Sequence, residues 1–426
     1  MNIEEIKSVR TAEKYYKINH PSGLTIYVYP KEGYSSAYAI FGTRYGSINT
    51  SFSVDDGEKI TVPDGIAHYL EHKLFESEDG DAFVRYAETG ANANAYTSFE
   101  KTCYLFSCTD KFDESLEILL DFVQSPYFTP ETVAKEQGII GQEIKMYDDS
   151  PDWRVMFNML ENMYHNHPVK IDIAGTVETI AEITAEKLYD VYNVFYNLNN
   201  MVLCVSGNVT VEQVLKTADK MLKPCEEHKI TNYFENEPYE IVKPYVEQSF
   251  SVAMPIFNLG FKEKADAVTT DKAAAQTDIL MFMLASATST LYRKLMDENL
   301  INDSFSYEVF DGPGYCSVIF GGESREPERA AKLIKEYIAQ IKSEGIDREE
   351  FEIAKKALYG NTVSALNSVD SIANILADTH FKGNKMFDYI EEIANATFED
   401  VSARLDMMLD VDNTTLSVVK PLEAEA

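Results

Sequence analysis

The chain repeats a pattern at half its own length, and this repeat restricts the possible folds more than any other feature of the sequence. Thr184-Ala-Glu-Lys-Leu-Tyr-Asp-Val is matched 213 positions later by Thr397-Phe-Glu-Asp-Val-Ser-Ala-Arg, and Asn200-Met-Val-Leu-Cys-Val is matched at the same offset by Asn413-Thr-Thr-Leu-Ser-Val. Few residues are identical, but a constant offset in a chain of 426 residues suggests two units of the same architecture. A chain of this length is also expected to form more than one domain.

Segments typical of strands alternate with segments typical of helices in both halves. Leu24-Thr-Ile-Tyr-Val-Tyr alternates in polarity, and Asn94-Ala-Tyr-Thr-Ser followed by Thr102-Cys-Tyr-Leu-Phe-Ser-Cys indicates a hairpin. Further strands are predicted near 202–205, 249–254, 305–310 and 315–321. Helices are predicted at 64–77, 82–88, 113–123, 211–222, 270–298, 325–344 and 348–380, and one more is predicted to run from 129 past 152. We therefore expect an α+β fold of two homologous α/β halves, each a mostly antiparallel sheet flanked by helices.

The boundary between the halves is predicted in a stretch of irregular composition. Residues 224–244 are rich in Glu, Pro and Tyr and have no clear period, as expected of a linker. The first domain is therefore predicted at 1–223 and the second at 245–426.

The first half carries a motif that points to metal chemistry, His68-Tyr-Leu-Glu71-His72. It reads His-x-x-Glu-His, the inverted form of the zincin signature. On a helix, His68 and His72 lie one turn apart on one face, where two imidazoles can bind one metal ion. Glu71 projects beside them, where a carboxylate can take a proton from metal-bound water. Pro63 and Asp64 suit a helix start with an acidic cap.

A third protein ligand distinguishes a metal site from a chance pattern, which we estimate to arise in about one chain in a hundred. The next long helix, which starts at Thr129-Pro, places the candidate ligands Glu136 and Glu143 on one face two turns apart. A solvated acidic face is the simpler interpretation of this helix in isolation. Gly138 and Gly141 inside it should each cost about 1 kcal/mol relative to alanine, and we predict that they allow another helix to approach closely.

Further segments complete a pattern that is known from one family. The pattern comprises His68-Tyr-Leu-Glu71-His72, Glu136, Glu143, Asn94-Ala-Tyr-Thr97, Glu100, Thr102, Tyr104, Gly175-Thr and Ile183-Thr-Ala-Glu186. With it the chain resembles the pitrilysin/insulinase family of zinc peptidases, the inverzincins, and looks most similar to the bacterial YmfH-like subgroup. The resemblance spans most of the first half and, more loosely, the second. It also implies that the two halves face each other across a cleft.

The resemblance implies a role for each matching residue. His68, His72 and Glu143 would bind Zn²⁺, Glu71 would be the general base, and Glu136 would be a supporting acid of the catalytic site. The substrate-binding residues would be Asn94, Ala95, Tyr96, Thr97 and Tyr307.

The second half departs from the family pattern at one position. Family members that act as single chains usually carry an arginine and a tyrosine there, which hold the substrate backbone near the zinc. Tyr307 fits the tyrosine, but Met296 stands where the arginine is expected. Arg293 and Lys294 are close in sequence, yet on a helix they need not point the same way. The resemblance therefore implies a homologous partner subunit that supplies the arginine and completes the substrate site. A homodimer of this chain is expected to bind zinc but to cleave peptides slowly.

The charge of the chain restricts its partners. A net charge of −32 disfavours nucleic acid and anionic membranes. It is compatible with steering of basic peptides, although an acidic surface that keeps the protein in solution is the simpler explanation.

The same composition predicts a cytoplasmic protein. No apolar run approaches the roughly 20 residues of a membrane span. The N-terminal residues lack the basic and then apolar pattern of a signal peptide. Five irregularly spaced cysteines argue against a disulfide framework.

Two functions of different classes follow from the sequence. The first is a zinc-dependent metalloendopeptidase that cleaves peptides or short unfolded segments, with Glu71 as general base. The second is a non-catalytic or modification-associated subunit of a two-chain complex, of the type associated with elongation factor P modification. The intact set His68, Glu71, His72 and Glu143 favours the first.

Overall fold

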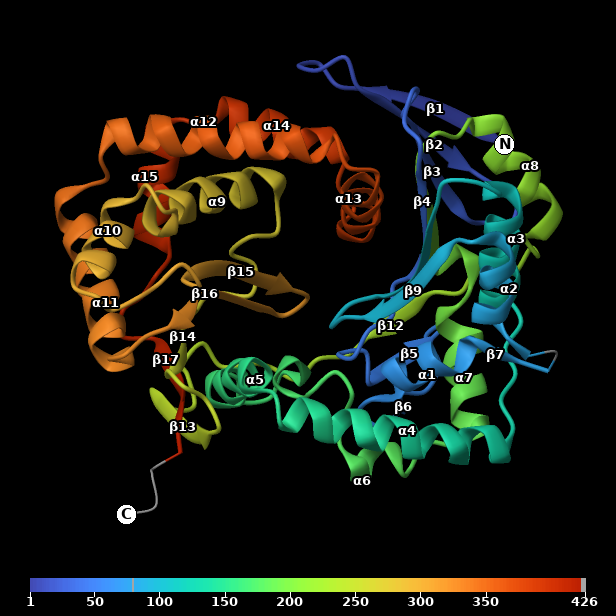
Figure 1. Cartoon of the computed structure of the whole chain (residues 1–426), viewed down its shortest axis with the longest axis horizontal. Coiled ribbons are helices and arrows are strands. Elements are labelled where there is room, and N and C mark those ends of the chain that lie inside the picture. Colours follow the sequence, from blue (N-terminus) through green and yellow to red (C-terminus); the bar gives the residue numbers. More distant parts are fainter. Residues whose placement is uncertain (79, 423–426) are drawn as a thin grey trace. The chain divides into compact units, whose positions relative to one another are not determined.

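The computed structural model describes residues 1–78 and 80–422, which form two compact units (Figure 1). The first unit contains Met1–Ile144, Asp172–Tyr233 and Val363–Phe387, and the second contains Lys145–Ile171, Phe234–Thr362 and the chain from Asp388 onward. The helices are α1 (Ile66–Leu74), α2 (Ala82–Thr89), α3 (Phe112–Val123), α4 (Pro130–Asp148), α5 (Pro151–Met163), α6 (Val177–Ile180), α7 (Ala185–Phe195), α8 (Val211–Met221), α9 (Asp271–Ala285), α10 (Thr290–Asp297), α11 (Pro327–Glu344), α12 (Arg348–Ala365), α13 (Val369–Lys382), α14 (Met386–Asn395) and α15 (Phe398–Met407).

The first unit is built on a seven-stranded sheet with the order β1-β2-β3-β11-β4-β10-β9. Neighbouring strands are antiparallel except β3 and β11, which are parallel. The strands are β1 (Asn2–Lys7), β2 (Lys14–Asn19), β3 (Thr25–Pro30), β4 (Ala37–Thr43), β9 (Asn92–Thr97), β10 (Thr102–Cys108) and β11 (Met201–Gly207). Two small sheets accompany it, one of β12 (Ile230–Asn232), β5 (Ser51–Val54) and β6 (Ile60–Thr61), the other of β7 (Glu76–Ser77) and β8 (Gly80–Asp81).

The second unit repeats the part of this sheet that extends from β3 to the edge strand β9. Its strands are β13 (Tyr245–Phe250), β14 (Ile256–Lys262), β15 (Ser306–Gly312), β16 (Tyr315–Glu323) and β17 (Thr414–Pro421), in the order β13-β17-β14-β16-β15. Only β13 and β17 are parallel, just as β3 and β11 are in the first unit. Thr184 and Thr397, which begin the sequence repeat, cap the equivalent helices α7 and α15. The prediction of two homologous, mostly antiparallel α+β units is therefore confirmed.

Each unit contains a helix from the opposite half of the sequence. Helix α13 buries Ile372, Ala373, Leu376 and Ala377 and packs on β3, β4 and β11 of the first unit. Helix α5 packs on β13, β14 and β17 of the second unit. The structure therefore differs from the predicted contiguous domains 1–223 and 245–426. Residues 145–171 belong to the second unit, and residues 363–387 belong to the first.

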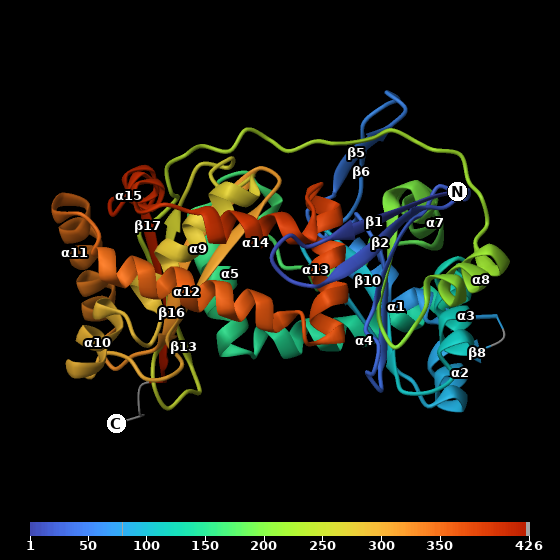
Figure 2. The ribbon, with the colours of Figure 1, turned by 90° about the horizontal axis from the view of Figure 1, so that it is seen from above.

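The predicted linker is an extended stretch that is held to both units. Figure 2 shows the chain running without a helix from α8 to β13. Its strand β12 pairs with β5 in the first unit. In the second unit, the Glu237 carboxylate accepts hydrogen bonds from the backbone N–H groups of His165, Asn166 and His167 at 2.7–2.8 Å. The units divide between Tyr233 and Phe234, inside the predicted linker.

Three long helices predicted from the sequence are each interrupted. The helix expected to run past 152 is divided into α4 and α5. The helix expected at 270–298 is divided into α9 and α10, and the helix expected at 348–380 is divided into α12 and α13. Pro151 starts α5, because proline has no backbone N–H for the hydrogen bond that would continue α4. Ser289 and Ser368 cap α10 and α13 with their hydroxyl groups. Among the described helices, none combines the length and the apolar character needed to cross a bilayer.

Gly138 and Gly141 do not mediate the close helix approach that the sequence suggested. A β-carbon built on either glycine would meet no atom within 4 Å. That prediction is wrong, and the space beside both residues permits a larger side chain.

We expect Gly138→Ala to raise the free energy of unfolding by about 1 kcal/mol, because alanine loses less backbone entropy than glycine inside a helix. Denaturant unfolding measures the change. Gly65→Ala is the opposite control, since Gly65 has φ of 85° and a β-carbon there would lie 2.3 Å from the Ala174 carbonyl oxygen. An unchanged or lower stability for Gly138→Ala would contradict the prediction.

Candidate metal centre

The histidine motif lies on α1, a short and almost completely buried helix. Ile66, Leu70 and Leu74 form its buried apolar stripe, as the sequence predicted. The helix starts after Gly65, whose positive φ of 85° favours glycine. Asp64 does not cap the helix, since no side-chain hydrogen bond is made at its N-terminus. The expected acidic cap is therefore wrong, and backbone geometry at Gly65 starts the helix instead.

Helix α4 lies against α1 and brings its carboxylates to the histidines. Val133, Ile140 and Ile144 are the buried face of α4, which matches the stripe predicted from the sequence. The Tyr69 hydroxyl on α1 donates a hydrogen bond to the Val133 carbonyl oxygen. This contact fixes the two helices side by side, so that the polar face of α4 meets the polar face of α1.

His68, His72 and Glu143 converge at this contact. His68 Nε2 lies 3.7 Å from Glu143 Oε1, and His72 Nε2 lies 3.3 Å from Glu143 Oε2. One ligand atom from each residue lies within 4.8 Å of the others. Ligands at about 2.0–2.2 Å from a tetrahedral metal ion are separated from one another by roughly 3.3–3.6 Å. The two imidazoles and the carboxylate thus fit a divalent metal ion with little movement.

Glu136 contacts the other nitrogen of His72. Its Oε1 lies 3.0 Å from His72 Nδ1, an interaction that leaves Nε2 free to face Glu143. Burial alone would lower the pKa of His72, but hydrogen bonds with Glu136 and Glu143 and the charge of Glu71 raise this pKa to about 10. Burial would raise the pKa of Glu136, yet the contact with His72 lowers it overall. The carboxylates around the histidines therefore favour a cation at this position.

His68 differs from His72 in the surroundings of its second nitrogen. His68 is only 7% exposed, and its Nδ1 has no hydrogen-bond partner among the described residues. A metal-binding histidine usually donates this second N–H to an oxygen. The orientation of His68 is therefore set by its packing inside α1, whereas that of His72 is set by Glu136.

Glu71 is held in place by a residue of the adjacent sheet. Its side chain is buried, and the Thr97 hydroxyl on β9 donates a hydrogen bond of 2.6 Å to Glu71 Oε2. The Thr102 hydroxyl lies 3.4 Å from that of Thr97 and donates to the Tyr45 carbonyl oxygen. Glu71 therefore presents an oriented carboxylate next to the candidate metal ligands. Sequence reasoning placed Thr97 in a substrate-binding strand and gave no signal for this contact.

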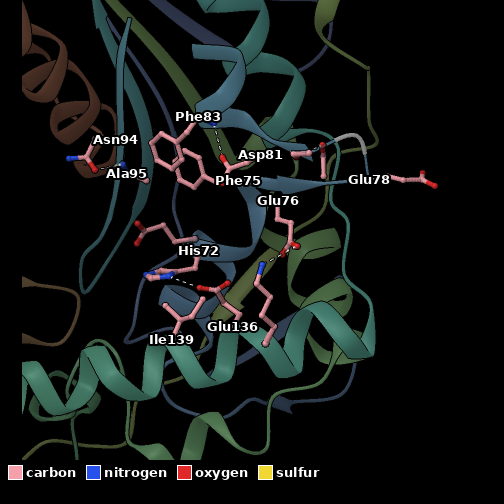
Figure 3. Close-up of a pocket in the computed structure, with 14 residues that line it drawn as sticks. His72, Phe75, Glu76, Glu78, Asp81, Phe83, Asn94, Ala95, Glu136 and Ile139 are labelled. Carbon is pink, nitrogen blue, oxygen red and sulfur yellow. Dashed lines mark hydrogen bonds and ion pairs between the residues drawn. The ribbon is translucent and has the colours of Figure 1, made fainter. Parts of the chain in front are cut away.

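A pocket of about 510 Å³ opens beside these residues (Figure 3). Glu71, His72 and Glu136 line one part of it, and Phe75 and Phe83 line another with rings stacked at 4.5 Å. Its size falls within the roughly 300–1,000 Å³ that is usual for ligand pockets. The pocket gives a bound molecule access to the carboxylate of Glu71.

The predicted substrate-binding residues lie in both units. Asn94, Ala95, Tyr96 and Thr97 lie on β9, an edge strand of the first sheet, and the first two line the pocket. Tyr307 lies on β15 of the second unit, where burial raises its pKa to about 12. Met296 lies on α10 of the same unit and is 39% exposed.

Other histidine and cysteine residues have no part in this site. His167 is buried, accepts a hydrogen bond from the Val169 N–H at Nδ1, and has Nε2 2.9 Å from the Pro313 carbonyl oxygen. This agrees with a role in shaping a loop. The five cysteines, all of which the structure describes, are free thiols.

The second unit has no equivalent of the metal centre on its helix α9. This helix contains neither histidine nor glutamate, and it buries Ile279, Leu280, Met281 and Leu284 in the core of its own unit. The second unit thus has the same kind of sheet as the first unit, but its helix α9 lacks residues equivalent to the candidate metal ligands.

Two described protein families match parts of the chain. Residues 53–177 match the family described as insulinase (peptidase family M16), and residues 182–358 match the family described as peptidase M16 inactive domain. The chain is 39% identical to a Bacillus subtilis protein named as the uncharacterized zinc protease YmfH, over 98% of this chain and 99% of that one.

Solved structures show the same fold. A crystal structure of an M16-like protein from Alicyclobacillus acidocaldarius has a TM-score of 0.92 and 33% identity, and covers 99% of both chains. A protease from Helicobacter pylori has a TM-score of 0.82 at 20% identity, again over 99% of both chains, which supports the fold alone. From its histidine motif, its repeated units and these matches, the chain belongs to the insulinase family, peptidase family M16, and within it to the proteins similar to YmfH.

Proposed function

We propose that this protein is a zinc-dependent metalloendopeptidase that cleaves peptides or short unfolded segments of proteins. The observation that carries the proposal is the convergence of His68, His72 and Glu143 within 4.8 Å, with the Glu71 carboxylate on the same short helix. The name of the relative YmfH, a zinc protease, supports zinc as the metal.

The residues of the site have separate roles in this proposal. A zinc ion bound by His68, His72 and Glu143 would supply Lewis-acid polarisation of the scissile carbonyl and lower the pKa of a water molecule. Glu71, oriented by Thr97, would accept a proton from the attacking water and deliver it to the leaving amine. Glu136 would keep His72 in the orientation that directs Nε2 to the metal.

The substrate would bind to β9 as an extended strand. In the described chain, β9 pairs only with β10, so its outer edge is open to a further strand. The Ala95 N–H donates to Asn94 Oδ1 at 2.9 Å, and a bound peptide would replace this contact if it pairs at Ala95. Asn94 and Ala95 line the pocket at this edge. Tyr307 is proposed as a further substrate contact, on the basis of the family pattern.

We further propose that the protein acts in the cytoplasm together with a second chain, either its own copy or a homologous subunit. Met296 occupies the position at which the family pattern has a substrate-binding arginine. A homologous subunit that carries the arginine would supply that group, whereas a second copy of this chain has the same methionine and would cleave peptides only slowly. The same substitution is the observation that supports the alternative function, a non-catalytic or modification-associated subunit of a two-chain complex.

Hydrolysis of unstructured peptides by the purified protein tests the proposal. We expect cleavage that a chelator abolishes and added zinc restores, with faster cleavage when a homologous chain carrying the arginine and tyrosine is added. Absence of cleavage under all these conditions, with zinc bound, would favour the non-catalytic subunit. Full activity of the lone chain, unchanged by the homologous chain, would rule out the two-chain requirement.

A further inference from the structure

The strand that contacts Glu71 also contacts a helix from the far end of the sequence. Thr97 on β9 donates to Glu71, and its neighbour Tyr96 donates from its hydroxyl to Asn374 Oδ1 on α13 at 3.3 Å. Successive side chains of a strand point to opposite faces of the sheet. One face of β9 therefore holds the proposed general base, while the other face is bound to α13.

The amide of Asn374 is itself oriented for this contact. Its Nδ2 donates to the Asp370 carbonyl oxygen on the same helix at 2.9 Å. This bond directs Oδ1 away from the helix axis, so that it can accept the Tyr96 hydroxyl. The Asn374 side chain also hydrogen bonds with Tyr38 on β4, so the amide contacts two strands of the sheet.

A second contact joins α13 to the turn that follows β9. Residues 98–101 connect β9 to β10, and the Ser98 N–H donates to the Lys101 carbonyl oxygen at 2.8 Å. The Lys101 ammonium group forms an ion pair with Asp378. Asp378 lies one helical turn beyond Asn374, so both residues face the hairpin.

One partner of this ion pair is largely buried, whereas the Asp378 side chain is 47% exposed. The Lys101 side chain is only 18% exposed, and burial lowers its pKa, so loss of its partner would leave a poorly solvated charge. Backbone hydrogen bonds from Ser47 and Ile48 to the carbonyl oxygens of Ser98 and Phe99 hold the same turn from the opposite direction. The turn therefore lies between a loop and α13.

We propose that Asn374 and Asp378 are positioning residues for the active site. Through Tyr96 and Lys101 they hold the hairpin of β9 and β10 at the place where Thr97 orients Glu71 and where the open edge of β9 receives the substrate. Because β9 is an edge strand with one neighbour, it depends on these contacts more than an inner strand does. The expected effect of these contacts on peptide hydrolysis rests on the proposed peptidase function. The expected ordering of the hairpin by α13 is independent of that function.

Two mild variants that keep the shape of the side chain test the proposal. Asp378→Asn removes the charge that pairs with Lys101, and Tyr96→Phe removes the hydroxyl that contacts Asn374 and Cys103. We expect both to retain bound metal, to exchange amide hydrogens faster in residues 92–101, and to lower kcat/KM about tenfold. Glu88→Gln is the matched control, because it neutralises an exposed carboxylate of α2 in the same unit. The exchange and the kinetic constants of the control should equal those of the wild type.

A charge exchange adds a rescue experiment. Lys101→Glu and Asp378→Lys should each accelerate exchange in the hairpin, and the double variant should restore much of the wild-type protection and kcat/KM.

Three results would overturn the proposal: unchanged exchange in 92–101, faster exchange spread over the whole first unit, or a loosened hairpin with normal kcat/KM. If the wild type itself cleaves no peptide, the peptidase function fails while the exchange experiment still decides whether α13 orders the hairpin.

Discussion

Glu71→Gln is expected to bind as much zinc as the wild type while hydrolysing peptides at least about a hundredfold more slowly. Glutamine has the shape of glutamate but cannot accept the proton of the attacking water. The ligands His68, His72 and Glu143 are unchanged, and the Thr97 hydroxyl, which lies 2.6 Å from Glu71 Oε2, can still donate to an amide oxygen. The variant would therefore lose catalytic activity but keep its bound metal and its fold. Steady-state kinetics and elemental analysis on one preparation measure both quantities.

Glu131→Gln is the control for this experiment. Glu131 is an exposed residue in the first turn of α4, so the same chemical change there should leave hydrolysis unaltered. Wild-type hydrolysis by Glu71→Gln would show that another group accepts the proton, and the proposed mechanism would be wrong.

His72→Ala is expected to lower the zinc content by about one equivalent per chain, since one of three protein ligands is lost. The variant also removes the histidine that Glu136 orients. Peptide hydrolysis should fall with the metal content. Elemental analysis after dialysis gives the stoichiometry directly.

The matched control is His165→Ala, since His165 lies on an exposed stretch of chain outside the metal centre. That variant should retain the full equivalent of zinc. Equal metal contents in His72→Ala and the wild type would mean that His72 is not a ligand.

The convergence of the candidate ligands could be predicted because it depends on local spacing. His68 and His72 share a helix face through the period of the α-helix alone, and the same holds for Glu136 and Glu143. Which of the two glutamates faces both histidines came from the family pattern, because spacing places both on the same side of α4. The structure separates them, with Glu143 between the histidines and Glu136 behind His72.

Other features depend on contacts between residues that are far apart in the sequence, and no sequence pattern indicated these contacts. An amphipathic helix such as α13 has an apolar face in either unit, and its pattern does not say which sheet that face will cover. The hydrogen bond from Thr97 to Glu71 likewise joins residues whose approach is set by packing of α1 against β9. By contrast, Pro151 and Ser289 were visible signals of helix starts, and the breaks they cause could have been predicted.

The exchange of α5 and α13 has a consequence for the order in which the newly made chain can fold. The strands of the first sheet are all synthesised once Gly207 has been added, but α13, which covers β3, β4 and β11, ends only at Lys382. At about 5–20 residues per second, ribosomes need roughly 9 to 35 seconds to make the intervening stretch. During that time one face of the sheet lacks its cover and exposes apolar side chains to other nascent chains. A fragment that stops at the predicted boundary near residue 223 would keep this face exposed permanently, so we expect it to aggregate or to require a chaperone.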